Sequence, residues 1–164
     1  MQHNLSASFH ILGTNIKGTV SNIYGPSIGV NKSSFLESLH WMGNQIGCNH
    51  WILGGYFNLI CNLGEKRGGS RQLTPHSQKF GDIIDSLHLV DVSTSNGLYT
   101  WNNKRFRDKS IATFLDHFLI SESLLMGGGD ISTVLLPSTG FDHWPIGLEW
   151  SRIRENLRRP FWFE

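Results

Sequence analysis

Three polar motifs interrupt the apolar stretches of this sequence, and their residue types could do chemistry. Asp116 lies within one apolar run, Asp142 and His143 together interrupt another, and Asn58 lies near the end of a third. A buried carboxylate is costly unless it is paired or does work. A carboxylate that accepts a hydrogen bond from a histidine N–H fixes the tautomer and orientation of that ring. The motifs therefore predict a pocket at strand ends where an aspartate orients a histidine, although a buried Asp–His hydrogen bond without catalytic role fits the same spacing.

The elements that must position these residues alternate between strands and helices. Apolar residues at helical spacing predict a helix over 33–46, and Thr74 as N-cap before Pro75 predicts the start of a second helix. Short apolar runs predict strands over 8–12, 18–24, 51–60, 98–101, 111–121, 131–136 and 146–150, and the glycine-rich segment 64–73 predicts a loop. This order predicts an α/β sandwich whose loops lie at strand ends.

The composition fits one globular domain and does not by itself indicate a partner. Of 164 residues, 39% are hydrophobic and 16% are charged, and 18 glycines with six tryptophans favour a turn-rich sheet protein over a helical bundle. The formal net charge of +1 does not indicate a nucleic-acid binder. Two basic groups could contact DNA or could be solvated charge: Lys104, Arg105, Arg107 and Lys109, and Arg152, Arg154, Arg158 and Arg159.

Cysteine use and hydropathy indicate an intracellular protein, nuclear or cytoplasmic. Cys48 and Cys61 are too few for a disulfide framework and form no CxxC pair, which favours a reduced compartment. The segment 1–11 has no basic region followed by an apolar run, so no secretory signal is expected. No stretch approaches the ~18 apolar residues of a membrane span.

Several short segments, taken in order, resemble one known family. These segments are Ile23–Pro26, Trp51–Asn58, Glu65–Ser70, Tyr99–Asn103, Leu115–Ser121, Phe141–His143 and Pro160–Glu164. Their order along nearly the whole chain resembles the later part of an endonuclease/exonuclease/phosphatase domain. Glu65–Ser70, Tyr99–Asn103 and Pro160–Glu164 are similar to the LINE-type (non-LTR) retrotransposon endonucleases of plants. The resemblance implies a four-layer sandwich of two packed β-sheets flanked by helices, with residues 1–151 as a partial domain and 152–164 as a basic tail.

The resemblance also implies Mg²⁺- or Mn²⁺-assisted hydrolysis of DNA phosphodiesters by a monomer that binds no membrane. Phosphate hydrolysis needs charge neutralisation, an aligned water and support for the leaving group. By resemblance, His143 would face the scissile phosphate, Asp116 would orient His143, and Asp142 would belong to the metal or acid cluster. Asn58 would position phosphate or water, and Tyr24 would donate to a phosphate oxygen or the leaving group.

Two departures from the family pattern weaken the implied site. Tyr56 stands where the family has an aspartate that aligns or deprotonates the attacking water, and a phenol with a pKa of ~10 is neutral at pH 7. Loss of a positioned general base typically costs ~10²–10⁴ in rate. The family's opening strands, with a metal-binding glutamate, have no counterpart before Tyr24, and Glu37 and Glu65 are poor substitutes. We therefore expect an incomplete N-terminus and impaired metal binding.

Two further departures are milder. Phe141 replaces a serine of the pattern and removes a hydroxyl near the phosphate site. His117 replaces an arginine and is interpreted as a neutral surface or packing residue.

The leading hypothesis is a retroelement-derived endonuclease domain that is weak or inactive as written. One alternative is a non-catalytic module that binds nucleic acid through Lys104–Lys109, which includes Arg105 and Arg107, and through the C-terminal arginines. Others are an active hydrolase of the same superfamily and a truncated reading frame whose product does not fold.

Overall fold

Strands and helices alternate along the residues that the computed structural model describes, 4–47, 50–127, 129–138, 140 and 142–152. The elements are β1 (Leu5–His10), β2 (Lys17–Tyr24), α1 (Val30–Ile46), β3 (His50–Tyr56), η1 (Leu63–Glu65), β4 (Lys66–Arg67), α2 (Pro75–Ser86), β5 (Leu89–Asp91), β6 (Trp101–Asn102), η2 (Arg107–Lys109), β7 (Ala112–Thr113), β8 (Asp116–Ser121), α3 (Glu122–Leu125), β9 (Gly129–Leu135) and β10 (Ile146–Arg152).

A five-stranded sheet in the order β1-β2-β3-β8-β5 forms the centre of the fold. Strands β2 and β3 are parallel, and the other neighbours are antiparallel. Parallel neighbours need a crossover, and α1 supplies it between β2 and β3. The antiparallel pair β9–β10 forms a second sheet, and β4, β7 and β6 form a small third one.

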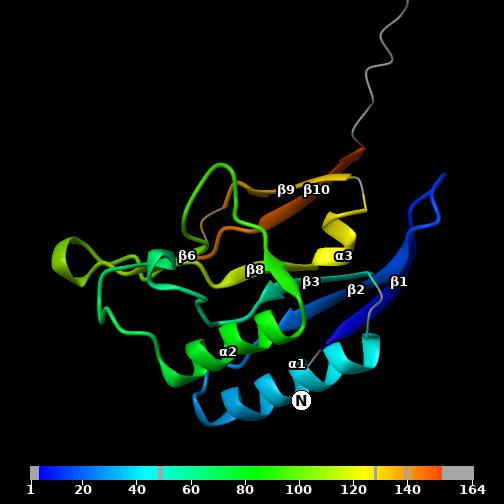
Figure 1. Ribbon diagram of the computed structural model, residues 1–164. Helices are drawn as coiled ribbons and strands as arrows, with labels where there is room; N and C mark the ends of the chain where they lie inside the picture. The colour runs from blue at the N-terminus through cyan, green and yellow to red at the C-terminus, as the bar shows by residue number, and fades with distance from the viewer. Residues whose placement is uncertain (1–3, 48–49, 128, 139, 141, 153–164) are drawn as a thin grey trace, which may run out of the picture.

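Two hydrophobic cores lie on the two faces of the central sheet. Figure 1 shows α1 and α2 on one side of this sheet and the β9–β10 pair on the other. Helices α1 and α2 cover one face, where Phe35 and Phe80 are fully buried against Leu53 of β3. On the other face, Ile52 and Ile120 pack toward the β9–β10 pair. Alternate residues of a strand face opposite sides, so each central strand contributes to both cores. The predicted α/β class with packed sheets is confirmed.

Two long strands expected from apolar runs are interrupted. The run 111–121 divides into β7 and β8, because β7 pairs with β4 and β6 while β8 pairs with β3 and β5. The run 51–60 stops as a strand at Tyr56, because Asn58 takes a left-handed backbone with φ of 55°. Both breaks lie beside the predicted chemical residues. Apolar composition therefore predicted burial correctly and strand continuity wrongly.

Other element limits differ in smaller ways. Helix α1 begins at Val30, three residues earlier than predicted, while α2 begins as predicted, with Thr74 accepting a hydrogen bond from the Ser77 N–H. The segment expected as loop 64–73 contains part of η1 and β4, and the strand expected over 98–101 starts only at Trp101. Within the described residues, no helix has the length and apolar character needed to cross a membrane.

Candidate active site

Three strand ends place three polar side chains in a row. Tyr24 at the end of β2 pairs in register with Tyr56 at the end of β3, and Tyr56 pairs with Asp116 at the start of β8. Paired residues of neighbouring strands point to the same face of a sheet. Tyr56 lies an even number of positions from Ile52 on β3, and Asp116 lies an even number from Ile120 on β8. Their side chains therefore point to the same face as these isoleucines, toward the β9–β10 pair. The hydrogen-bond register thus gathers residues that are far apart in sequence.

His143 contacts this row through Asp116. Its Nδ1 lies 3.3 Å from Asp116 Oδ2, and the two side chains are 37% and 17% exposed. The backbone of His143 forms a bridge with Trp101, and the Trp144 N–H donates to the Thr100 carbonyl at 2.8 Å. Burial raises the pKa of Asp116, although bonds from Thr100 and His143 oppose that shift. A mostly buried carboxylate therefore contacts a histidine that solvent can reach.

Tyr56 occupies the space next to the histidine. Its ring centroid lies 5.1 Å from that of His143 and 5.4 Å from that of Tyr24. Burial, followed by the nearby Tyr24 and Asp116, raises the pKa of Tyr56 to about 12. The phenol is consequently neutral at physiological pH and cannot accept a proton from water there.

Asn58 is held by backbone contacts at the turn after β3. Its Nδ2 donates to the Pro26 carbonyl at 3.0 Å, and its own carbonyl accepts from Lys32 Nζ at 2.7 Å. The neighbouring Gly25 N–H donates to the Tyr56 carbonyl at 2.6 Å. These bonds fix Asn58 to the segment that carries Tyr24. One amide hydrogen of Asn58 is therefore used in positioning that turn.

Asp142 lies beside His143 in sequence, but its carboxylate contacts a different group. Oδ2 accepts a hydrogen bond from Trp101 Nε1 at 3.0 Å. This indole bond is the main reason that the pKa of the exposed Asp142 lies below its usual value. Asp142 is therefore an ionised surface carboxylate whose orientation is set by Trp101.

The loop between β6 and β7 carries the predicted basic residues next to an aromatic hollow. Lys104, Arg105 and Arg107 are all exposed, and Lys104 Nζ donates to the Gly140 carbonyl at 2.8 Å. The hollow has a volume of about 550 Å³, and its lining includes Tyr99, Trp101, Phe106, Trp144, Lys104 and Arg105. Phe106 is 89% exposed. Phe141, Arg154, Arg158 and Arg159 lie outside the described residues.

Solved structures share this arrangement of sheets. The chain resembles the endonuclease domain of TRAS1, a telomere-specific non-LTR retrotransposon, with TM-score 0.63 and 15% identity over 93% of this chain and 64% of that one. It resembles an endonuclease/exonuclease/phosphatase family protein from Bacteroides thetaiotaomicron, with TM-score 0.53 and 17% identity over 94% and 57%. The fold is that of the endonuclease/exonuclease/phosphatase proteins.

A third solved structure is also similar in fold to this chain. Beta toxin from Staphylococcus aureus has TM-score 0.57 and 12% identity over 90% of this chain and 57% of its own. The chain spans less than two thirds of each of these three structures. No protein-family model and no curated protein matches the sequence.

The resemblance to this family implies a divalent metal, so the donors near His143 must be compared with what Mg²⁺ requires. Mg²⁺ needs oxygen ligands in near-octahedral geometry, usually including one or two carboxylates. Here the Asp116 carboxylate contacts His143, and the Asp142 carboxylate contacts Trp101. One group of three His, Cys, Asp or Glu side chains in the described part of the chain has ligand atoms within 4.8 Å of one another. It consists of Cys61, Glu65 and His117 and does not include His143. The described residues around His143 therefore do not fit a metal centre.

Sequence reasoning missed the side chains that support this site within the endonuclease/exonuclease/phosphatase fold. Thr100 is fully buried, and its Oγ1 accepts from the N–H groups of Leu115 and Asp116 at 2.9 and 3.2 Å. Of the two roles expected for His117, surface or packing, the surface role is wrong, because His117 is fully buried. Its ring packs in the core and is bonded through both nitrogens. A polar side chain inside an apolar run was the available signal for both residues.

Proposed function

We propose that this chain is a DNA endonuclease domain by descent, of the LINE retrotransposon type, whose phosphodiesterase site is weak or inactive as written. The proposal is supported by the fold, by the His143–Asp116 pair at the ends of the strands, and by the order of the sequence motifs. His143 would face the scissile phosphate, Asp116 would hold the His143 ring, and Tyr24, with an exposed ring, would donate its phenol proton.

One observation carries the inactivity: the Tyr56 ring lies against both His143 and Tyr24. A water that attacks phosphate needs a group that aligns it and takes its proton. A phenol with a pKa of about 12 cannot take that proton at neutral pH. Its ring also fills space beside His143 that a shorter carboxylate would leave open. Asp142 does not compensate, because its Oδ2 is bonded to Trp101.

Nicking of supercoiled plasmid with Mg²⁺ or Mn²⁺ tests the proposal. We expect the purified chain to nick no faster than its His143→Ala variant. The exposed α1 residue His40 offers a matched control, since His40→Gln should behave like the unchanged chain. Metal-dependent nicking that His143→Ala abolishes and His40→Gln preserves would show a working site and refute the inactivity.

A second candidate function is DNA binding without cleavage, and the hollow beside the β6–β7 loop favours it. Aromatic rings can stack on bases and basic side chains can contact phosphates, and both line this hollow. Proteins that bind the DNA backbone lose affinity as salt increases, with a slope of about 0.9 per phosphate contact in duplex DNA.

Fluorescence anisotropy with short single- and double-stranded DNA at several salt concentrations measures this binding. Arg105→Gln should reduce the salt slope by roughly 0.9, and Phe106→Ala should weaken binding to single strands. Lys79 lies on α2 beside Glu37, at 3.6 Å, so Lys79→Gln is a charge-matched control that should change neither property. Absence of binding at low salt, or equal loss in the control, would exclude a specific role for this loop.

A further inference from the structure

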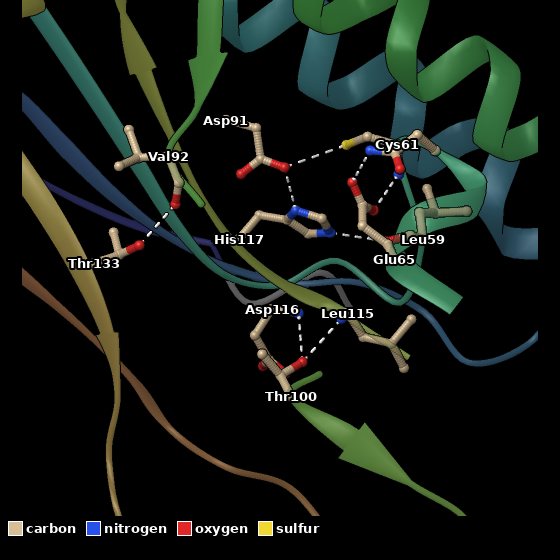
Figure 2. Close-up of polar contacts among 11 residues, drawn as sticks. Leu59, Cys61, Glu65, Asp91, Val92, Thr100, Leu115, Asp116, His117 and Thr133 are labelled. Carbon is tan, nitrogen blue, oxygen red and sulfur yellow. Dashed lines mark hydrogen bonds and ion pairs between the residues drawn. The ribbon is translucent and has the colours of Figure 1, made fainter. Parts of the chain in front are cut away.

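A second polar cluster lies behind the candidate site, on the opposite face of strand β8. Asp116 points toward His143, and its neighbour His117 points toward the core beneath α2, as expected for successive strand residues. Figure 2 shows the His117 ring between Asp91 and the Leu59 carbonyl, with Cys61 and Glu65 beside it. His117 has no exposed surface. The candidate site described above does not use this cluster.

Both ring nitrogens of His117 face hydrogen-bond acceptors. Nδ1 lies 2.7 Å from Asp91 Oδ2, and Nε2 lies 2.9 Å from the Leu59 carbonyl oxygen. A neutral imidazole has one N–H and one lone pair, whereas an imidazolium has two N–H groups. A neutral ring would direct its lone pair at a carboxylate or a carbonyl in a buried space, where an unpaired polar contact is costly. With Asp91 as a carboxylate, the two short contacts together place two protons on the ring.

We propose that His117 is a buried imidazolium at neutral pH and a positioning residue for strand β8, and through it for Asp116. The cation joins three segments: the turn after β3 through Leu59, strand β5 through Asp91, and the η1 turn through the charge of Glu65. The proposal concerns the support of the site and does not depend on the proposed activity.

The charges around the ring are consistent with a cation. Burial alone lowers the pKa of His117, but the hydrogen bond and charge of Asp91, then Glu65 and the Leu59 carbonyl, raise it above its usual value. Asp91 Oδ1 is buried without a hydrogen-bond partner among the described residues, so its negative charge is balanced chiefly by the ring. The ring of His117 also contacts the rings of Phe57, Phe80 and Phe114, with 5.0 to 5.8 Å between centroids.

A metal ion in the same cluster is the main competing explanation. Cys61, Glu65 and His117 have ligand atoms within 4.8 Å of one another. Their atoms already have protein partners, however: the Cys61 thiol donates to Asp91 Oδ2 at 3.6 Å, and the Glu65 carboxylate accepts from the Cys61 N–H and from Asn62 Nδ2. The 2.7 Å between His117 Nδ1 and Asp91 Oδ2 is the length of a direct charge-assisted hydrogen bond. The contacts favour a proton over a metal in this position.

The sign of the pH effect follows from the raised pKa. A group whose pKa is raised on folding contributes stability that is complete below its unfolded pKa and is lost as pH rises through the folded pKa. For His117 this window extends upward from its ordinary value of 6.5. The facing ionisable groups are Asp91 of β5, Glu65 of η1 and Cys61 after β3. We expect stability and the position of Asp116 to change together in this window.

Nitrogen-15 NMR of the imidazole rings in the full chain tests the proposal without any substitution. At pH 7.5 both His117 nitrogens should have the shifts of protonated nitrogen. As pH rises, the His117 step should appear also in the resonances of Asp116 and His143. A single protonated His117 nitrogen at pH 7.5 would overturn the proposal, and so would Asp116 and His143 signals that do not follow that step.

Two further measurements separate the proton from a metal and from simple packing. The urea midpoint of the unchanged chain should fall between pH 7 and pH 9, while His117→Phe should lose that dependence and His40→Gln should keep it. Added Co²⁺ or Zn²⁺ should leave the His117 nitrogen shifts unchanged. If Co²⁺ binds stoichiometrically and gives a thiolate absorption band that Cys61→Ser removes, the cluster is a metal site. That result would overturn the proposal of a buried imidazolium. Plasmid nicking plays no part in these results, so failure here leaves the proposed function untouched.

Discussion

Replacement of Thr100 by valine tests how the candidate site is supported. Thr100 Oγ1 accepts from two backbone N–H groups, Leu115 at 2.9 Å and Asp116 at 3.2 Å, at the point where β7 ends and β8 begins. Valine has nearly the same shape but cannot accept, so Thr100→Val leaves both amides without their partner. A buried unsatisfied donor costs about 1–3 kcal/mol. Because the second bond is long, the expected loss is roughly 2–4 kcal/mol.

Thermal and urea unfolding measure this loss directly. A chain of this size loses about 2–4 °C of Tm per kcal/mol, so Thr100→Val should melt roughly 5–15 °C lower. Thr100→Ser is the matched control: it keeps the oxygen and removes one methyl group, for a loss of about 1 kcal/mol. If the serine variant is the less stable of the two, packing of the methyl group outweighs the hydrogen bonds, and the account of Thr100 is refuted.

Three other substitutions follow from local geometry. Gly25→Ala would place a Cβ 2.3 Å from the Phe57 carbonyl oxygen and should lower the free energy of urea unfolding by about 1–3 kcal/mol. The control Gly29→Ala has no atom within 4 Å of the new Cβ and should lie within ~0.5 kcal/mol of the unchanged chain. Equal effects of the two variants would contradict the close approach at Gly25. Asn58→Ala should lower the free energy of unfolding by about 1–3 kcal/mol, because φ is 55° and the hydrogen bond to Pro26 is lost. Asn58→Gly should lower it less, since glycine adopts this φ without strain. If calorimetry gives the reverse order, backbone strain at Asn58 is excluded. Trp101→Phe removes the indole donor, so the lowered pKa of Asp142 should return toward its usual value in a carbon-13 NMR titration, and an unchanged titration would show that Trp101 is not the cause.

The sequence predicted the helices and the buried segments of the fold more reliably than the limits and pairing of the strands. The apolar spacing of α1 and α2 and the capping residue Thr74 identified both helices, because these signals are local. The division of 111–121 into two strands depends on pairing partners from distant segments, which local composition does not reveal. The end of β3 at Tyr56 depends on the left-handed backbone of Asn58. Asparagine tolerates this conformation, but its presence in a sequence does not predict it.

The candidate site was predicted in part for a similar reason. Asp116 and His143 stood out as polar residues within apolar segments, and the structure brings them to 3.3 Å. The bond from Trp101 to Asp142 could not be predicted, because it joins residues 41 positions apart. His117 was misjudged because its partners, Asp91 and the Leu59 carbonyl, come from two other segments. Residue type indicated that chemistry was possible, and only the fold shows which groups meet.

In the proposed function, Tyr56 occupies the position of a catalytic carboxylate, between Tyr24 and Asp116 in the strand register. The most direct measurement compares plasmid nicking by Tyr56→Asp and Tyr56→Asn in Mg²⁺ or Mn²⁺. Both variants remove the ring and have the same size, but only aspartate adds a carboxylate that can accept a proton and serve as an oxygen ligand of Mg²⁺. We predict that Tyr56→Asp gains about 10²-fold over the unchanged chain, that His143→Ala abolishes the gain, and that Tyr56→Asn gains little. Equal rates for the two variants, or no gain in either, would contradict this prediction.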